Sequence, residues 1–491
     1  MSISKQFLSV SVWTAISRLL GFARDVLIAS LMGAGRGADI FFAAFRIPNM
    51  LRNLFGEGAL QASFVPMLVE RKNNSEVNFA NMAFSWLMLI MLLITIAAVI
   101  AMPLIMLIIA PGFSAEPGKL AEAIDVGRLL FPYSLLICAV GFLSGVLNAN
   151  HRFALAAAMP AFLNIFMIAG AVGAWHFGWA VAPALSIAVL LSGAFQIWIL
   201  WSRIRSGNFG LRLVRPRGST DMKTLGRRML PGIVGSGAYH INVMISTILA
   251  SLTPGAVSWL YYADRMIQLP FAVIGLAIGT VLLTAISKAL AEGDKQLATQ
   301  HQNNAITNIL FWTLPAFAGL AALAEPITRI LFQRGEFTAF DTAQTAGAIL
   351  LLSFALPAMS LSQVFEKTLF ADKNTKTPAK IGILSILGGT IAAIALYPVM
   401  GFLSVALATS LSAWARLFML ARAAHRRDLF HLDSCTILNG LVFMAAAAMM
   451  YFGLKMFEVP NLIQLGALIA VAGGAYLVGM KLFLVFMKKP G

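Results

Sequence analysis

The feature that most constrains the fold is a series of apolar stretches, each long enough to cross a bilayer as a helix. A spanning helix needs about 20 mostly apolar residues, and about fourteen such stretches follow one another along the chain. Only 11% of the 491 residues are charged, whereas soluble domains carry about 25%. The sequence therefore predicts an all-α polytopic membrane protein.

The boundaries of these stretches follow from hydropathy and from the polar links between them. The predicted helices cover residues 7–32, 38–69, 78–110, 119–148, 153–175, 179–202, 228–251, 256–287, 302–324, 341–371, 377–398, 401–422, 434–455 and 462–487.

The cations of the loops alternate between the two sides of the predicted membrane. On one side they are numerous and include Lys5, Arg71, Lys72, Arg152, the run from Arg203 to Arg228, Lys288, Lys295, Lys373, Lys376, Lys380, Arg422, Arg426, Arg427, Lys488 and Lys489. On the other side they are few, chiefly Arg36, Lys119, Arg329, Arg334 and Lys455. The positive-inside rule then predicts that both termini are cytoplasmic. Because the net charge of +16 is mostly topological, nucleic-acid binding is not expected.

The chain contains an internal repeat. Residues 38–46 (ADIFFAAFR) resemble residues 257–265 (VSWLYYADR), which begin 219 positions later and place Arg46 opposite Arg265. Residues 147–150 and 369–372 match at an offset of 222, and residues 29–31 and 250–252 match at 221. A repeat of six helices, an even number, predicts two parallel halves that enclose a central cavity and are related by an axis along the membrane normal.

This repeat gives the predicted domain organisation. Residues 1–203 form an N-terminal six-helix lobe, 204–227 a basic cytoplasmic linker that touches anionic lipid headgroups, and 228–427 a second six-helix lobe. Residues 428–491 add two helices outside the repeat.

Four arginines lie inside the first two predicted helices: Arg18 and Arg24, then Arg46 and Arg52. One such cation at the centre of a spanning helix costs about 2.5–3.5 kcal/mol, so it must face a cavity, a counter-charge or an anion. The nearby carboxylates, which are fewer, belong to Asp25, Asp39 and Glu57. A purely structural role as internal salt bridges is the alternative, especially for Arg46 and Asp39, which lie seven residues apart on one face.

The excess of cations favours an anionic ligand. A guanidinium donates in pairs to carboxylate or phosphate oxygens, so arginine rather than lysine points to a diphosphate. In the second half only Asp264 and Arg265 keep charge at depth, so Arg265 is expected to approach the ligand from that half. Two weaker candidates are His240, as a proton relay or a neighbour of an ion site, and Arg416, as a further cation of the cavity. Glu366 and Lys367 are expected to pair with each other or to reach the membrane interface.

Signals of enzymatic chemistry are absent from the sequence. It has no phosphate-binding glycine loop of the Walker type, no spacing of His, Cys or Glu typical of metal ligands, and no loop long enough for a catalytic domain. We therefore predict a secondary-type transporter with no catalytic residues, no metal and no cofactor. The residues do not specify a coupling ion.

Several motifs together resemble the signature of the MurJ (MviN) family of lipid II flippases, in the multidrug/oligosaccharidyl-lipid/polysaccharide exporter superfamily. These motifs are Ser17-Arg18, residues 21–25 (GFARD), residues 38–39 with 45–49 (AD and FRIPN), Arg52, residues 56–59 (GEGA), residues 64–66 (FVP), residues 261–265 (YYADR) and residues 332–337 (FQRGEF). The resemblance extends over essentially the whole chain.

The resemblance implies a function. Family members move undecaprenyl-diphosphate-linked disaccharide pentapeptide, the peptidoglycan precursor, from the cytoplasmic to the periplasmic leaflet of the bacterial inner membrane. It also implies that Arg18, Arg24, Arg52 and Arg265 bind substrate and that Asp25 and Asp39 are gate or salt-bridge residues, to which the residues add Arg46, Glu57 and Asp264 as cavity support. The last two helices would form a groove for the lipid tail. Lipid II, membrane lipids and other cell-wall synthesis proteins are the partners it suggests.

Two other classes of protein remain as alternatives. An ion-coupled exporter of drugs or of other polyprenyl-linked oligosaccharides would share the fold, although a cavity for organic cations needs carboxylates where this chain has arginines. A membrane glycosyltransferase acting on polyprenyl donors would share the diphosphate-binding cations but would also need a catalytic carboxylate or a large extracellular loop.

Overall fold

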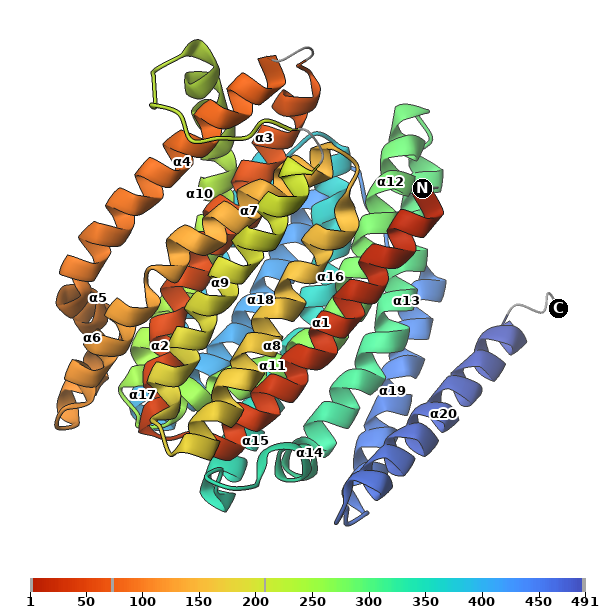
Figure 1. Ribbon diagram of the computed structural model, residues 1–491. Helices are drawn as coiled ribbons and strands as arrows, with labels where there is room; N and C mark the ends of the chain where they lie inside the picture. The colour runs from red at the N-terminus through yellow and green to blue at the C-terminus, as the bar shows by residue number, and fades with distance from the viewer. Residues whose placement is uncertain (1–2, 72–74, 207–208, 488–491) are drawn as a thin grey trace. The chain divides into compact units, whose positions relative to one another are not determined.

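The structure is a computed structural model that describes residues 3–71, 75–206 and 209–487. Its described residues form helices joined by turns and short links, and none of them forms a strand (Figure 1). Ten of these helices are long and apolar enough to cross a membrane, counting α6 with α7 and α15 with α16 as one span each. The predicted class, an all-α polytopic membrane protein, is confirmed.

By internal packing the chain divides into two units. Unit 1 comprises Met1–Ser258 and Arg334–Phe337, and unit 2 comprises Trp259–Gln333 and Thr338–Gly491. This packing boundary lies some thirty residues after the predicted boundary between the lobes at 227 and 228. The reason is that α10 (Thr220–Ser251), the first helix of the second repeat, packs against helices of the first repeat. The predicted lobes follow the sequence repeat and stay a prediction.

The elements of unit 1 begin with α1 (Ile3–Met32), α2 (Arg36–Leu51), the π-helix η1 (Arg52–Gly58), α3 (Ala59–Val69), α4 (Ser75–Ile100), α5 (Met102–Ile109) and the 3-10 helix η2 (Pro111–Ala115). They continue with α6 (Lys119–Leu130), α7 (Tyr133–Ala149), α8 (Phe153–Phe177), α9 (Val181–Arg205) and α10 (Thr220–Ser251). Within this unit α8 packs between α1 and α9, and α7 packs on α9, α4 and α3 (Figure 1).

The elements of unit 2 begin with α11 (Ala256–Phe271), whose first turn belongs to unit 1, the π-helix η3 (Ala272–Leu276), α12 (Ala277–Ala291), α13 (Lys295–Ala322) and α14 (Ala324–Phe332). They continue with α15 (Ala339–Ser353), α16 (Ala355–Ala371), α17 (Lys376–Met400), α18 (Leu403–His425), α19 (Ser434–Lys455) and α20 (Leu462–Met487).

The order of elements repeats along the chain. Each copy has a first helix, a second helix interrupted by a π-helix, and a third span followed by a short helix, which is α5 in one copy and α14 in the other. A two-part helix and two further long helices complete each copy. Arg52 opens η1 and Ala272 opens η3, 220 positions later, which agrees with the offsets of the sequence repeat.

Besides the two stretches interrupted by a π-helix, three predicted helices are divided where a single helix was expected. The stretch 78–110 divides at Ala101, just before Pro103, and the stretch 119–148 divides at Pro132. Proline lacks the amide hydrogen that would continue the helical ladder, so a new helix begins at each of these positions. The stretch 341–371 divides at Phe354.

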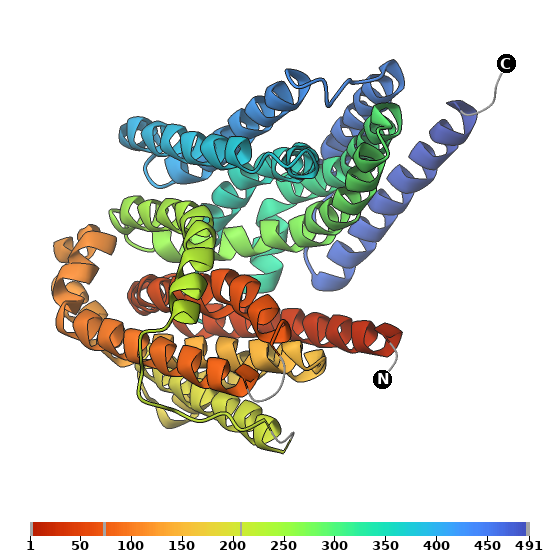
Figure 2. The same cartoon turned by 90° about the horizontal axis from the view of Figure 1, so that it is seen from above.

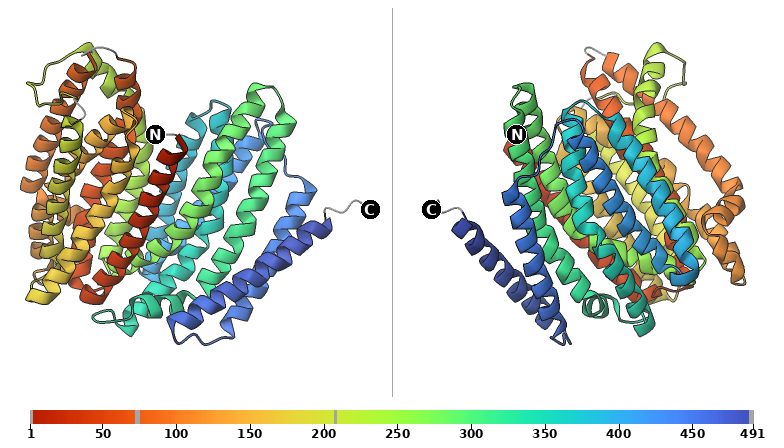
Figure 3. Two further views of the ribbon diagram at one scale, coloured as in Figure 1. Left: turned by 45° about the vertical axis from the view of Figure 1, so that its right-hand side comes forward. Right: turned by 180° about the vertical axis from the view of Figure 1, so that it is seen from behind.

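The two helices beyond the repeat differ in how firmly they pack. In unit 2, α19 lies along α13, where Phe443 and Ala447 meet Leu314 and Ala318 (Figure 3). By contrast, only 11% of the apolar window of α20 is buried, which leaves most of this helix free to face lipid. The groove for a lipid tail that was expected from these two helices stays a prediction.

One end of unit 1 is held by close backbone contacts at glycines. The Glu336 amide donates to the Ser30 carbonyl at 2.9 Å, and a β-carbon on Gly335 would lie 2.1 Å from that oxygen. At the same end, a β-carbon on Gly112 would lie 2.0 Å from the carbonyl oxygen of Ser251, where α10 ends. Only glycine permits backbone segments to approach this closely.

We expect Gly112→Ala to destabilise the protein by about 1–3 kcal/mol, because the added methyl must push two backbone segments apart. Thermal unfolding of the purified protein in detergent measures this loss as a lower melting temperature. Gly173→Ala is the matched control, since nothing lies within 4 Å of its β-carbon position. Equal melting temperatures for the two variants would show that the close contact at Gly112 does not matter.

Candidate functional site

Arg24 and Asp25 form a buried ion pair on α1. Their exposed fractions are 6% and 3%, and the Arg24 Nη2 and Nε atoms donate to Asp25 Oδ1 at 2.7 and 3.0 Å. Arg24 Nη1 also donates to Asn164 Oδ1 on α8 at 2.8 Å, and Asn164 Nδ2 donates to the Ser17 carbonyl at 2.9 Å. Asp25, which the sequence places on the face of Arg18, thus neutralises its neighbour Arg24.

The other predicted cations of unit 1 differ in exposure. Arg18 is exposed, whereas Arg46 and Arg52 are partly buried. Arg52 begins the π-helix η1, which follows Pro48 and ends at Gly58. π-Helical turns are rare in proteins overall, but many of those that occur lie at functional sites. The wider turn redirects the side chains that follow it.

Arg52 also lines a cavity inside unit 1. The cavity has a volume of about 420 Å³ and is bounded by α1, α3, α7, α8 and α9. Its polar walls include Gln61, Tyr133, Asn148 and Gln196, and apolar side chains of α7 and α8 form much of the remainder. A guanidinium beside neutral hydrogen-bonding groups suits an anion that carries polar substituents.

Asp39 is the most thoroughly bound side chain of the site. It has no exposed surface and accepts hydrogen bonds from Lys119 Nζ at 3.1 Å, the Gly255 amide at 2.8 Å and the Ser258 amide and hydroxyl at 3.1 and 2.8 Å. Lys119 is 1% exposed and also contacts Glu116 at 2.7 Å. Asp39 therefore joins the start of α2 to the start of α6 and to the first turn of α11.

The partner of Asp39 is its own counterpart in the repeat. Ser258 occupies the position that the 219-residue offset aligns with Asp39. The alignment of two repeat positions does not predict that they touch, so the contact of Asp39 with Ser258 was not predicted. Lys119 was counted only as a loop cation, so its contact with Asp39 was not predicted either. The signal for Lys119 was its position directly before an apolar stretch, three residues after Glu116.

Arg265 of unit 2 is oriented by its own helix. Its Nη2 donates to the Tyr261 hydroxyl at 2.9 Å, its guanidinium lies 5.0 Å from the Tyr261 ring centroid, and its Nη1 donates to Gln268 at 3.4 Å. Gln268 in turn donates to Asp264, which is exposed. Residues one turn apart on a helix are neighbours, which explains why Tyr261 can hold Arg265.

The weaker candidates are placed as follows. Arg416 Nη2 lies 2.7 Å from Glu366 Oε2, so this pair joins α18 to α16, whereas Lys367 lies over the Phe370 ring. His240, on α10, is 8% exposed. The Glu57 side chain lies outside the described residues, so its predicted supporting role stays a prediction.

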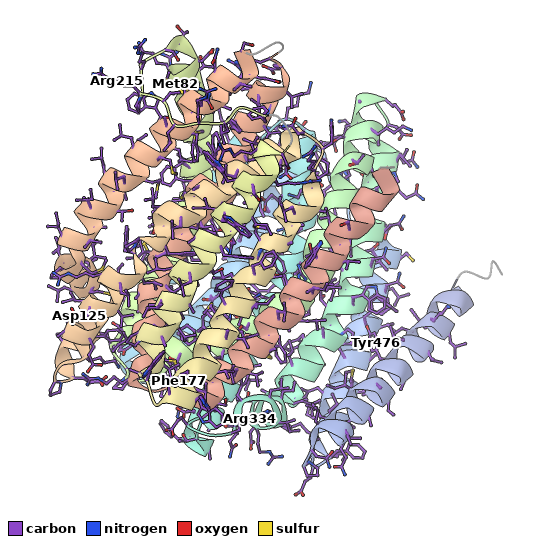
Figure 4. The ribbon with its side chains drawn as sticks, viewed as in Figure 1. Met82, Asp125, Phe177, Arg215, Arg334 and Tyr476 are labelled. Carbon is purple, nitrogen blue, oxygen red and sulfur yellow. The ribbon has the colours of Figure 1, made fainter. Side chains whose placement is uncertain are left out.

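Over the described part of the chain, no cluster of three or more His, Cys, Asp or Glu side chains could hold a metal ion. Figure 4 shows the side chains of both units. The predictions of no metal, no cofactor and an unspecified coupling ion are not tested by this arrangement.

This fold and this set of intramembrane cations define a polytopic transporter. A family model described as "Lipid II flippase MurJ" matches residues 28–469. The chain is 36% identical over 428 residues to a "Probable lipid II flippase MurJ" of Rhizobium meliloti, covering 86% of this chain and 80% of that protein. A protein of the same description from Vibrio cholerae is 32% identical over 463 residues, with coverage of 89% and 86%.

Solved structures agree with these relatives. "Lipid II flippase MurJ, inward closed conformation" superposes with a TM-score of 0.84 at 25% identity, covering 98% of this chain and 99% of that one. An inward-facing multidrug resistance MATE family transporter of the MOP superfamily gives 0.69 at 15% identity, with coverage of 90% and 96%, which is a likeness of fold alone. The chain belongs to the MurJ family of lipid II flippases.

We expect Asp39→Asn to destabilise the protein, because breaking a buried ion pair from one side costs about 3–5 kcal/mol when the remaining charge is left uncompensated. Glu116 still faces Lys119 in this variant, so the loss should fall at the lower end of that range. Adding Lys119→Met should restore part of the melting temperature. Strictly additive effects of the two substitutions, measured by thermal unfolding, would contradict a coupled pair.

Proposed function

We propose that this protein flips lipid II, the undecaprenyl-diphosphate-linked peptidoglycan precursor, from the cytoplasmic to the periplasmic leaflet of a bacterial inner membrane. The proposal rests on membership of the lipid II flippase family. The observation in the structure that supports it most is that Arg52 lines a cavity among membrane helices. A buried or half-buried arginine suits the oxygens of a diphosphate, which it binds in pairs.

The mechanism we propose is alternating access. The two repeats would rock about a central cavity that opens first to one leaflet and then to the other. Substrate anion would shift the balance between the two states through its contacts with the cations, which in the empty protein repel one another or pair with carboxylates such as Asp25. The protein would act as a secondary-type transporter without catalysing a reaction.

We further propose that both termini are cytoplasmic and that the protein works beside other proteins of cell-wall synthesis. The alternation of loop charge supports this topology. Export of drugs by the same fold is a less favoured function, because the polar groups at depth include several arginines rather than mainly carboxylates.

The direct test is transport of labelled lipid II by the purified protein in liposomes. Arg52→Ala and Arg265→Ala should each remove a charge-assisted contact worth about 1.5–3 kcal/mol and so weaken lipid II binding by roughly one to two powers of ten. Lysine at either position should restore binding only in part, because it keeps the charge and loses the planar pair of donors. Lys288→Ala is the control, since Lys288 is 78% exposed. Lipid II transport that is absent from the wild-type protein would refute the proposed function.

Arg24 should behave differently, because its charge is already compensated within α1. Arg24→Ala leaves the buried Asp25 carboxylate without this cation, so we expect less folded protein in the membrane, and the double variant with Asp25→Ala should restore the amount. Lipid II affinity of this restored double variant then reports the ligand contact of Arg24 separately from its structural role. A normal amount of Arg24→Ala protein with unchanged affinity would exclude both roles.

A further inference from the structure

In the link between α9 and α10, residues 209–219 form an ordered strap. We call residues 209–219 the basic strap. It runs without helix to Thr220, where α10 begins, and it passes along the first turns of α4 (Figure 2). All of these elements belong to unit 1.

Side chains of α4 hold the backbone of the strap. Asn81 accepts from the Arg212 amide at 2.8 Å and donates to the Gly210 carbonyl at 3.4 Å, and Ser85 accepts from the Val214 amide at 2.8 Å. Asn81 and Ser85 are one helical turn apart, a rise of about 6 Å. The amides of residues two apart in an extended chain are separated by about 6.6 Å. The helix and the strap therefore match in register.

The far end of the strap is held as well. Trp86 Nε1 donates to the Arg217 carbonyl at 3.0 Å, and the Arg217 amide donates to the Met82 sulfur at 3.2 Å. Just beyond it, Arg71 forms an ion pair with Asp221 at 2.8 Å. These contacts fix the backbone at both ends.

Fixing the backbone leaves the basic side chains on the outside. Arg212, Arg215 and Arg217 are exposed, and Leu213 is 63% exposed, whereas Leu211 is buried. Figure 4 labels Arg215 and Met82 at this end of the unit.

The surroundings of the strap are strongly basic. Between residues 203 and 228 there are seven arginines and one lysine against one acidic residue, Asp221, which gives a net charge of +7. The cations outside the strap are Arg203, Arg205, Lys223, Arg227 and Arg228, all of them exposed. The predominance of arginine favours phosphate, whose oxygens accept two guanidinium hydrogens at once.

The position of the strap suits a membrane phosphate. It adjoins the ends of two candidate spans, Ser75–Ile100 and Val181–Arg205, so it lies where the hydrocarbon core gives way to headgroups. An exposed leucine beside exposed arginines also suits that boundary, because the leucine can enter the acyl region while the guanidinium groups stay among the phosphates.

We propose that the basic strap is a preformed binding surface for the phosphate groups of anionic phospholipids in the adjoining leaflet. Asn81 and Ser85 present the arginines in a fixed row, so that binding depends on their arrangement as well as on their charge. The surface is separate from the cavity at Arg52 and does not depend on the transport of lipid II.

The test measures how strongly the purified full-length protein in neutral detergent retains phosphatidylglycerol over phosphatidylcholine, by native mass spectrometry. At about 1 kcal/mol per cation near an anionic headgroup, replacing Arg212, Arg215 and Arg217 together by glutamine should reduce the preference by up to roughly 100-fold. The matched control replaces Lys373, Lys376 and Lys380 by glutamine, which removes the same charge from another exposed basic segment. This control should leave most of the preference intact.

A second variant, Asn81→Ala with Ser85→Ala, separates arrangement from charge. It keeps every cation, and we expect it to lose a measurable part of the preference because the strap is no longer held. A wild-type protein with no preference for phosphatidylglycerol, or equal losses in the strap and control triple variants, would overturn the proposal. An unchanged preference in the Asn81 and Ser85 variant would overturn it too, since charge alone would then suffice. Binding of an acidic protein in place of lipid would likewise contradict it.

Discussion

The structure of unit 1 depends on one buried carboxylate. Asp39 has no contact with solvent, and a carboxylate in such a place must be met by a counter-charge and by hydrogen-bond donors. Lys119 supplies the charge, and Gly255 and Ser258 supply backbone and hydroxyl donors at the first turn of α11. Because an amino-terminal helical turn presents unpaired amides, this is a favourable position for a negative charge.

The same end of unit 1 combines this polar contact with close backbone packing. Gly112 meets the carbonyl of Ser251, and Gly335 meets that of Ser30, where any side chain would collide. Directional hydrogen bonds and tight steric fit both tolerate little displacement.

Compensation of charge also changes how the intramembrane arginines are understood. From sequence they form one group of cations in excess over carboxylates. In the structure Arg24 forms an ion pair with Asp25, and Arg416 forms one with Glu366. Arg265 donates a hydrogen bond to the Tyr261 hydroxyl and lies over the Tyr261 ring. These contacts orient each guanidinium. An arginine can be held in position in this way and still bind a ligand. The structure shows the first of these two roles directly.

The sequence by itself determined the class of fold, the approximate limits of the long helices and the repeat, because hydrophobic length and loop charge are local properties of the chain. It also singled out Arg24, Asp25 and Asp39 as buried charges. The pairing of Asp39 with Lys119 and Ser258, the π-helices at Arg52 and Ala272, and the hydrogen bonds from α4 to the strap were decided only by the tertiary structure. The hydrogen bonds join residues 80 or more positions apart in the chain, which become neighbours only through packing, so no local pattern encodes them.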